Sequence, residues 1–238
     1  MAQADFDFVT GGLGGSMGGG PDGAAMVHAA LSSPLTGEGV YCRRFSPINS
    51  TLYSVNASIK ASVAGGLFDA IPVTKSISLR AWLRSENYLT GTAIGIVAKM
   101  HPDANANARE NAVGYTLGFG SWSDTLNNNS LKLHMRSTNS VYKNVYLKTL
   151  STNTWYKVRL DVIPTGSSFD TINVYTGTGA TGSEIWTLEH TEIVLNSAPH
   201  YVPWAQSGGG KVGWNYRSEG SSAGSVYIDR FEAYLEDV

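Results

Sequence analysis

The chain consists largely of short runs in which apolar and polar residues alternate, from about residue 38 to its end. In SISLRAWLRS and SLKLHMRS, for example, apolar residues recur at every second position. Similar runs lie at residues 93–100, 113–119, 156–162, 172–174 and 226–235. A period of two places the apolar residues on one face of a β-strand, and turn-rich segments separate the runs. No segment shows the 3.6-residue period and the caps of a helix, so the pattern predicts an all-β protein.

The apolar face of each run defines the predicted core. Strands that are apolar on one face only are typical of two antiparallel sheets packed together. We therefore predict an all-β, two-sheet antiparallel jelly-roll sandwich over residues 38–238. Its expected buried residues include Leu79, Leu117, Val158, Leu160 and Ile228. In the last run the alternation shifts by one residue at Asp229-Arg230, which indicates a β-bulge.

Residues 1–37 differ in composition from the rest of the chain. Between residues 11 and 23 the sequence reads GGLGGSMGGGPDG, with eight glycines in thirteen positions. Ordering a backbone costs roughly 1–2 kcal/mol per residue, and glycines bring no side chain to offset that cost. One interpretation is a flexible linker. We favour an N-terminal Gly-rich arm that becomes ordered on a neighbouring chain and is anchored there by Phe6, Phe8 and Met26.

The charge balance and the cysteine count exclude several classes of function. The chain has 17 Lys and Arg against 19 Asp and Glu, so it lacks the basic surplus typical of nucleic-acid binding. Its single cysteine, Cys42, excludes an internal disulfide framework and a multi-cysteine zinc site. The first residues lack the features of a signal peptide, and no apolar run approaches the ~20 residues that span a bilayer. We expect a protein that is made in the cytoplasm and has no membrane partner.

An ordered series of motifs carries a resemblance to a known family. The segments are SISLRAWLR, GIVAKM, GYTLGF, LKLHMR, TWYKVRLDV, TINVYTG and SVYIDRFEAY. In this order they resemble concanavalin A-like lectin/glucanase domains of the laminin-G-like kind. The resemblance covers roughly residues 38–238 and implies a jelly-roll sandwich. It implies no single function, because this fold occurs in lectins, hydrolases, lyases and structural modules.

The Gly-rich arm and the missing secretion signal resemble bacteriophage virion proteins. This resemblance implies a protein that is made in the host cytoplasm and attached to the virion through its N-terminal arm. Tail, baseplate and head-decoration proteins are the corresponding classes. The expected partners are other virion proteins, copies of the same chain in an oligomer, and surface glycans. The leading hypothesis is a non-enzymatic virion structural or adhesion protein with a lectin-like sandwich, and a free carbohydrate-binding lectin is the alternative.

The residues do not favour catalysis. Glycosidases need two carboxylates about 5–10 Å apart, and the glycosidases of this fold resemble one another in a Glu-x-Asp-x-x-Glu strand that is absent here. The nearest acidic cluster is Glu184, Glu189 and Glu192, whose spacing does not keep all three on one strand face. The Arg-rich strand, the Gln-x-His strand and the Tyr-Lys pair of jelly-roll lyases are also missing. We predict a non-enzymatic protein, with an unrecognised glycoside hydrolase as a third alternative.

The sequence favours no metal site. The five histidines do not show the short spacings of zinc ligands. Calcium needs only carboxylate and backbone oxygens, and the family resemblance implies it as an option. The candidate ligands are Asp103 and Asn105, or Asp124 and Asn127. Because Asp and Asn also cap their own turns, we favour the turn role and predict neither a metal nor another cofactor.

Aromatic residues in turn-rich segments are the stronger signal. A sugar stacks its apolar face on Trp or Tyr, at roughly 1 kcal/mol per ring, while Asn, Asp or Arg bind its hydroxyls. The candidate glycan-binding residues are Trp122, Asp124, Trp204, Trp214, Asn215 and Tyr216. The alternative is that these rings close the edges of the sandwich or form a subunit contact. Trp82 shares a strand face with Arg80 and Arg84, which predicts cation–π stacking, contact with a partner, or packing at the edge of the core.

Overall fold

The computed structural model of the chain describes most of the sandwich. The described residues are 2–6, 17–18, 26–30, 41–45, 52–59, 71, 75–87, 92–100, 114–120, 127–137, 141–165, 168–202, 210–219 and 225–237. Within these ranges the chain forms fifteen strands and no helix. These ranges therefore hold no helix that is long and apolar enough to cross a membrane. The described fold is all-β, as the alternation predicted.

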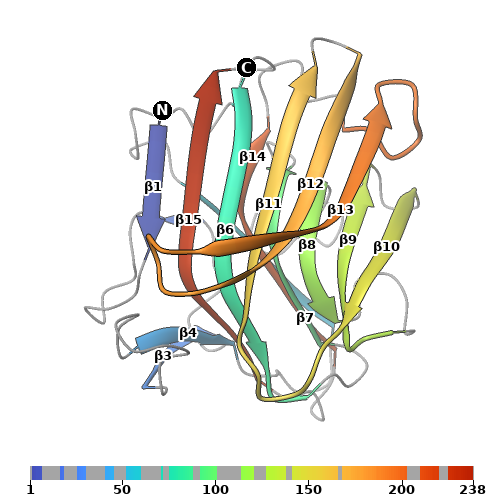
Figure 1. Cartoon of the computed structure of the whole chain (residues 1–238). Helices are drawn as coiled ribbons and strands as arrows, with labels where there is room; N and C mark the ends of the chain where they lie inside the picture. Colours follow the sequence, from blue (N-terminus) through green and yellow to red (C-terminus); the bar gives the residue numbers. More distant parts are fainter. Residues whose placement is uncertain are drawn as a thin grey trace.

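The strands form two antiparallel sheets that pack face to face (Figure 1). The eight-stranded sheet runs β13 (Ile185–Leu195), β12 (Phe169–Thr178), β11 (Tyr156–Thr165), β6 (Lys75–Ser85), β15 (Val226–Asp237), β4 (Tyr41–Phe45) and β3 (Met26–Ala30), and β1 (Ala2–Phe6) also pairs with β15. The seven-stranded sheet runs β10 (Tyr142–Thr149), β9 (Ser130–Arg136), β8 (Gly114–Gly120), β7 (Thr92–Met100), β14 (Lys211–Glu219), β5 (Leu52–Ile59) and β2 (Met17–Gly18). The predicted two-sheet antiparallel sandwich is confirmed.

The core lies between the inner faces of the two sheets. The five residues predicted to be buried there are Leu79, Leu117, Val158, Leu160 and Ile228, and all five are fully buried. The predicted bulge is present as well, because the register between β15 and β6 shifts between Asp229 and Glu232. Arg230, inside that shift, has a left-handed φ of 48°. Face assignments made from the period of two therefore hold on both sides of the irregularity.

An ion pair joins the two sheets inside the core. Lys99 Nζ of β7 lies 2.5 Å from Asp170 Oδ1 of β12, and Tyr115 of β8 donates a 2.8 Å hydrogen bond to Asp170 Oδ2. The alternation placed Lys99 on the outer face of its strand. A φ of 52° at Lys99 and an irregular register between β7 and β14 turn it inward instead. Burial lowers the pKa of Lys99, and the charge and hydrogen bond of Asp170 oppose that shift.

Three segments of the predicted arm are strands of the same sandwich. β1 pairs with β15, from Ala2 opposite Leu235 to Phe6 opposite Phe231. β2 pairs with β5, and β3 pairs with β4, where Met26 lies in the first position. Backbone pairing within the chain thus places these three segments beside strands of their own sandwich. Phe8 lies outside the described residues, and attachment of the arm to a partner stays a prediction.

Candidate functional site

The outer face of the eight-stranded sheet carries a band of aromatic and cationic side chains. On β11, Val158 and Leu160 point into the core, so Lys157, Arg159 and Asp161 point outward. The pairing of β11 with its two neighbours then sets what surrounds them. Arg159 lies opposite Arg80 of β6 on one side and opposite Tyr175 of β12 on the other. Residues that are far apart in the sequence thus share one surface, which we call the outer face.

Trp186 of β13 lies at the centre of the cations on this face. Its ring centroid is 5.7 Å from the Arg80 guanidinium, 5.9 Å from Lys157 Nζ and 5.9 Å from the Arg159 guanidinium. A glycine on the neighbouring strand makes this position possible. A Cβ at Gly177 would lie 2.7 Å from two carbons of the indole, so the ring occupies space that any other residue would fill. Cations over the face of a tryptophan stabilise the ring where it lies.

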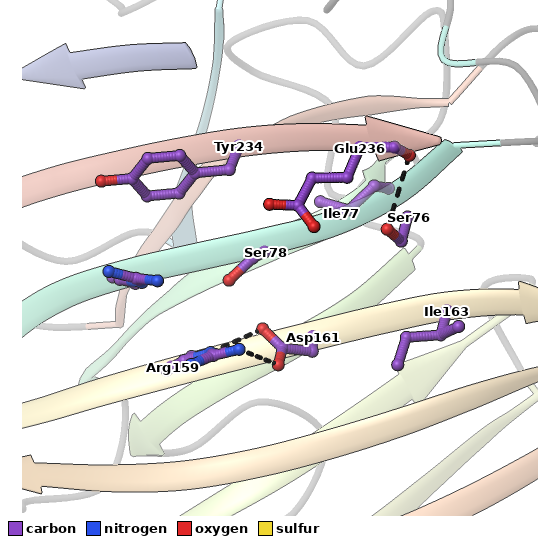
Figure 2. A pocket seen from close by; sticks show the side chains of 9 residues that line it. Ser76, Ile77, Ser78, Arg159, Asp161, Ile163, Tyr234 and Glu236 are labelled. Carbon is purple, nitrogen blue, oxygen red and sulfur yellow. Dashed lines mark hydrogen bonds and ion pairs between the residues drawn. The ribbon is translucent and has the colours of Figure 1, made fainter. Parts of the chain in front are cut away.

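A hollow of about 260 Å³ opens beside this cluster (Figure 2). It lies over β15, β6 and β11, and its lining combines hydroxyls, both arginines, two carboxylates and one aromatic ring. The lining residues are Ser76, Ile77, Ser78, Arg80, Arg159, Asp161, Ile163, Tyr234 and Glu236. Figure 2 shows Tyr234 on β15 and the Arg159–Asp161 pair on β11 on opposite sides of Ser78. The hollow is therefore mostly polar and accessible from the outer face.

The two arginines of the hollow differ in their partners. Arg159 is held by a fork of hydrogen bonds to Asp161, at 2.8 and 2.6 Å. Burial alone would lower the pKa of Arg159, but the bonds to Asp161 raise it. Arg80 stacks on Tyr234, with 4.7 Å between guanidinium and ring centroid, and no ion pair or hydrogen bond joins it to another described residue. Its Nε is buried and without a hydrogen-bond partner, and so is the Oγ of Ser78.

Unpaired buried polar atoms are unusual in proteins, and each calls for an explanation such as a bound water, an ion or a ligand. At this hollow two such atoms, from Ser78 and Arg80, come from neighbouring outward positions of one strand. A guanidinium offers several donors in a planar fork that fits a carboxylate. The described residues thus leave an anion-binding group and a hydroxyl unpartnered at the wall of the hollow.

Trp82 and Lys157 extend the outer face beyond Trp186. Lys157 Nζ lies 5.1 Å from the Trp82 ring centroid and pairs with Glu184 Oε1 at 3.0 Å. Trp82 is only 5% exposed, and its Nε1 has no hydrogen-bond partner. The predicted cation–π contact of Trp82 is therefore present, but the cation is Lys157, whereas Arg84 lies over Tyr227 at 5.1 Å. A second hollow is lined by Trp82, Asn153, Thr154, Trp155, Gly177, Thr178 and Gly179.

Of the residues proposed from the sequence for glycan binding, the three that the structure describes do not lie at this face. Trp122, Asp124 and Trp204 lie outside the described residues. Trp214, Asn215 and Tyr216 lie in strand β14 of the other sheet and are buried, which corrects their predicted position in a loop. Trp214 packs edge-on against Phe231 at 5.3 Å, and Tyr216 stacks on Phe45 at 4.9 Å. Neither ring can stack on a sugar from inside the core.

Sequence reasoning missed Arg159, Tyr175, Trp186 and Tyr234. A signal for Arg159 was present in the sequence. It stands at a polar position of an alternating run, and the apolar positions of that run were assigned to the core. The same parity argument that singled out Trp82 would have found it. The flanking glycines and polar residues of KVGWNYRSEG drew attention to a loop instead. The alternation of Val212, Trp214 and Tyr216 was the signal of a strand.

Of the four candidate calcium ligands, the structure describes one, and it describes all three residues of the acidic cluster. Asp103, Asn105 and Asp124 lie outside the described residues, and Asn127 occupies a turn with a left-handed φ of 54°. In the described part of the chain no three His, Cys, Asp or Glu side chains are placed to hold a metal ion.

Each member of the acidic cluster is paired with a lysine. Glu184 binds Lys157, Glu189 binds Lys148 at 3.4 Å, and Glu192 binds Lys143 at 2.9 Å. Burial would raise the pKa of Glu184 and of Glu192, but hydrogen bonds from these lysines hold both below the ordinary value. The general acid of a glycosidase needs a raised pKa. Glu184 and Glu192 are therefore suited to ion pairing rather than to proton donation.

Comparisons with known proteins identify the fold. No protein-family model matches the sequence, and no curated protein matches it. Among solved structures, the chain is similar to a protein of unknown function from Shewanella oneidensis MR-1, with a TM-score of 0.55, 14% identity and coverage of 99% of this chain and 86% of that one. It is also similar to the carbohydrate recognition domain of Emp47p, with a TM-score of 0.52, 10% identity and coverage of 97% and 94%.

A marine PL-14 alginate lyase from Aplysia kurodai is similar as well, with a TM-score of 0.51, 9% identity and coverage of 89% and 87%. At these identities the likeness concerns the fold and not the activity, and the fold is shared by a sugar-recognition domain and a lyase. The chain therefore has the concanavalin A-like jelly-roll fold that its ordered motifs resemble.

Proposed function

We propose that the chain is a non-enzymatic glycan-binding protein whose outer face binds a sugar that carries a carboxylate. The observation that carries this proposal is the Arg80 guanidinium, which lies at a hollow, stacks on Tyr234 and has no acidic partner among the described residues. A charge-assisted pair between guanidinium and carboxylate is among the stronger hydrogen-bonded contacts in proteins. Its planar fork also selects a planar anion such as the carboxylate of a uronic or sialic acid.

The neighbours of Arg80 fit the rest of a sugar ring. The hydroxyl of Ser78, buried and unpartnered, can bond to a ring hydroxyl, and the Trp186 ring lies 5.7 Å from the Arg80 guanidinium beside the hollow. The hollow, at about 260 Å³, lies below the roughly 300–1,000 Å³ of sites that enclose a drug-sized ligand. This size suits one sugar residue bound from the open side. Such a site binds weakly by itself, and several linked copies raise the apparent affinity.

Titration calorimetry with an oligogalacturonate and with a neutral glucan of equal length tests the sugar class. We expect the acidic oligomer to bind more tightly. Arg80→Met should weaken binding of the acidic oligomer about tenfold or more, because hydrogen bonds to charged groups contribute roughly 1.5–3 kcal/mol. Arg84→Met, on the same strand face but away from the hollow, is the matched control and should bind like the wild type. Equal binding of both oligomers would overturn the acidic specificity, and binding of neither would overturn the glycan-binding function.

The proposed absence of catalysis is tested with the same substrates. The lowered pKa values of Glu184 and Glu192 support it, because neither carboxylate is suited to donate a proton near neutral pH. Incubation with polygalacturonate and alginate should release neither new reducing ends nor unsaturated products. Sustained turnover that disappears in Glu184→Gln or Glu192→Gln would show that the chain is an enzyme.

We also propose that residues 1–37 attach this module to a bacteriophage virion, as the Gly-rich composition of the segment suggests. A virion would supply the many copies that a weak glycan site needs. Chains that lack residues 1–24 should remain folded and fail to join the particle. Incorporation of the truncated chain at wild-type levels would favour the alternative, a free lectin.

A further inference from the structure

The edge strand β13 exposes apolar side chains along its length. The exposed fractions are 72% for Ile185, 53% for Leu188, 58% for Ile193 and 52% for Leu195. One edge of β13 pairs with β12, and no described strand pairs with its other edge. Proteins usually protect a long edge strand with lysines, prolines or inward-pointing charges, because an open edge can pair with another chain. Apolar residues on an open edge therefore indicate a contact surface.

The charged residues of β13 do not protect this edge. Glu189 pairs with Lys148, and Glu192 pairs with Lys143, both from β10 of the other sheet. Glu189 also accepts a hydrogen bond from Thr176 of β12. The acidic side chains are thus directed towards their own sandwich. Each copy brings two glutamates and two lysines to this side of the molecule, so two copies meet without a net repulsion from these groups.

The order of residues on β13 is complementary to itself. Leu188 lies opposite Tyr175, and Ile193 lies opposite Thr171 on β12. Because the register shifts between Val174 and Tyr175, both apolar side chains lie on the outer face despite their odd spacing. In an antiparallel pair of two β13 strands with the twofold axis at Thr191, and with Glu189 and His190 of each copy together opposite Glu192 of the other, Leu188 of one copy faces Ile193 of the other. Symmetry repeats the contact on the other side of the axis.

The same pairing places Trp186 of one copy opposite Leu195 of the other, again on the outer face. We propose that two copies of the chain associate through β13, edge to edge and antiparallel, so that their eight-stranded sheets form one continuous sheet. The backbone donors and acceptors of both edges then pair, as they do when a strand is added to a sheet. Both outer faces lie on the same side of the joined sheet, which makes the pair bivalent for any ligand of that face. The proposal does not depend on what that ligand is.

Sedimentation velocity of the full chain over a concentration series tests the association. We expect a dimer. The double variant Leu188→Lys with Ile193→Lys should be a monomer, with the circular dichroism spectrum and melting temperature of a folded sandwich. Tyr142→Lys, at a residue that is 41% exposed on the edge strand β10 of the other sheet, is the matched control and should remain a dimer. A wild-type chain that stays monomeric at every concentration would overturn the proposal.

Disulfide cross-linking tests the register. Leu188→Cys and Ile193→Cys chains, mixed under oxidising conditions, should form a disulfide between the two variants. Neither variant alone should cross-link, because like residues lie five positions apart in this register, about 17 Å at 3.4 Å per residue. The native Cys42 is buried, and cross-linking of the wild-type chain under the same conditions measures its background contribution. A chain without residues 1–24 should remain a dimer. Loss of the dimer on that truncation would instead identify the N-terminal segment as the occupant of the edge, and would overturn the proposed pairing.

Discussion

At the scale of single residues, the molecule uses charges in two different ways. Lys99, Asp170 and Tyr115 form a buried group inside the core, in which the ammonium and the phenol both donate to one carboxylate. Arg80 on the outer face stacks on Tyr234 and has no acidic partner among the described residues. The first group stabilises the contact between two sheets. The second is available to a ligand.

The buried ion pair predicts a large and non-additive effect on stability. Removing one partner of a buried pair leaves an uncompensated charge and costs about 3–5 kcal/mol, whereas replacing both partners with apolar groups is much less costly. We expect Lys99→Met to lower the free energy of unfolding by that amount, measured in urea. The double variant Lys99→Met with Asp170→Leu should lose clearly less unfolding free energy than the two single variants lose together. Additive losses would show that the two groups do not depend on each other.

The Glu184–Lys157 pair predicts how stability changes in acid. Burial would raise the pKa of Glu184, but hydrogen bonds from Lys157 and from the Gly182 N–H hold it below the ordinary value of 4.5. A carboxyl with a lowered folded pKa contributes its full stability above about pH 4.5 and loses it as the pH falls through the folded pKa. Melting temperatures of the wild type should therefore fall below pH 4.5. Glu184→Gln should melt lower near neutral pH and show a weaker fall, and the exposed Glu236→Gln should follow the wild type.

At the scale of the strands, one glycine on β12 decides where an aromatic ring on β13 lies. The indole of Trp186 crosses the backbone at Gly177, and a Cβ there would overlap its ring atoms. We expect Gly177→Ala to displace the indole and change its near-ultraviolet circular dichroism and fluorescence. The free energy of unfolding should change little, because the Trp186 indole lies on the outer face of the sheet and can move away from the new methyl group. Binding of the acidic oligosaccharide should weaken. Thr178→Ala, the adjacent exposed position, is the control, and an unchanged tryptophan signal in Gly177→Ala would contradict the role of the glycine.

At the scale of the whole molecule, the N-terminal strands β1 and β2 each pair with one strand of the sandwich. The described core residues run from Phe45 to Leu235, and β1 covers one stretch of β15. We expect a chain without residues 1–24 to keep its strand content and to unfold cooperatively. It should bind an apolar dye more than the full chain does, because the edge of β15 becomes accessible. Loss of the folded state on truncation would show that β1 and β2 are essential parts of the sandwich.

The alternation along the sequence determined which face of each strand lies in the core, because a period of two assigns faces from neighbouring residues alone. Leu79, Leu117 and Val158 were therefore predictable, and so was the bulge at Asp229-Arg230, where the parity changes. The ordered motifs indicated the jelly roll itself. The candidate site could not be predicted in the same way, because it depends on which strands are neighbours and in what register. Tertiary pairing alone brought Arg80, Arg159 and Trp186 together from three strands distant in the sequence. It also turned Lys99 inward at an irregular register and buried the rings of Trp214 and Tyr216. Such outcomes depend on contacts between distant segments, which no local pattern of residues records.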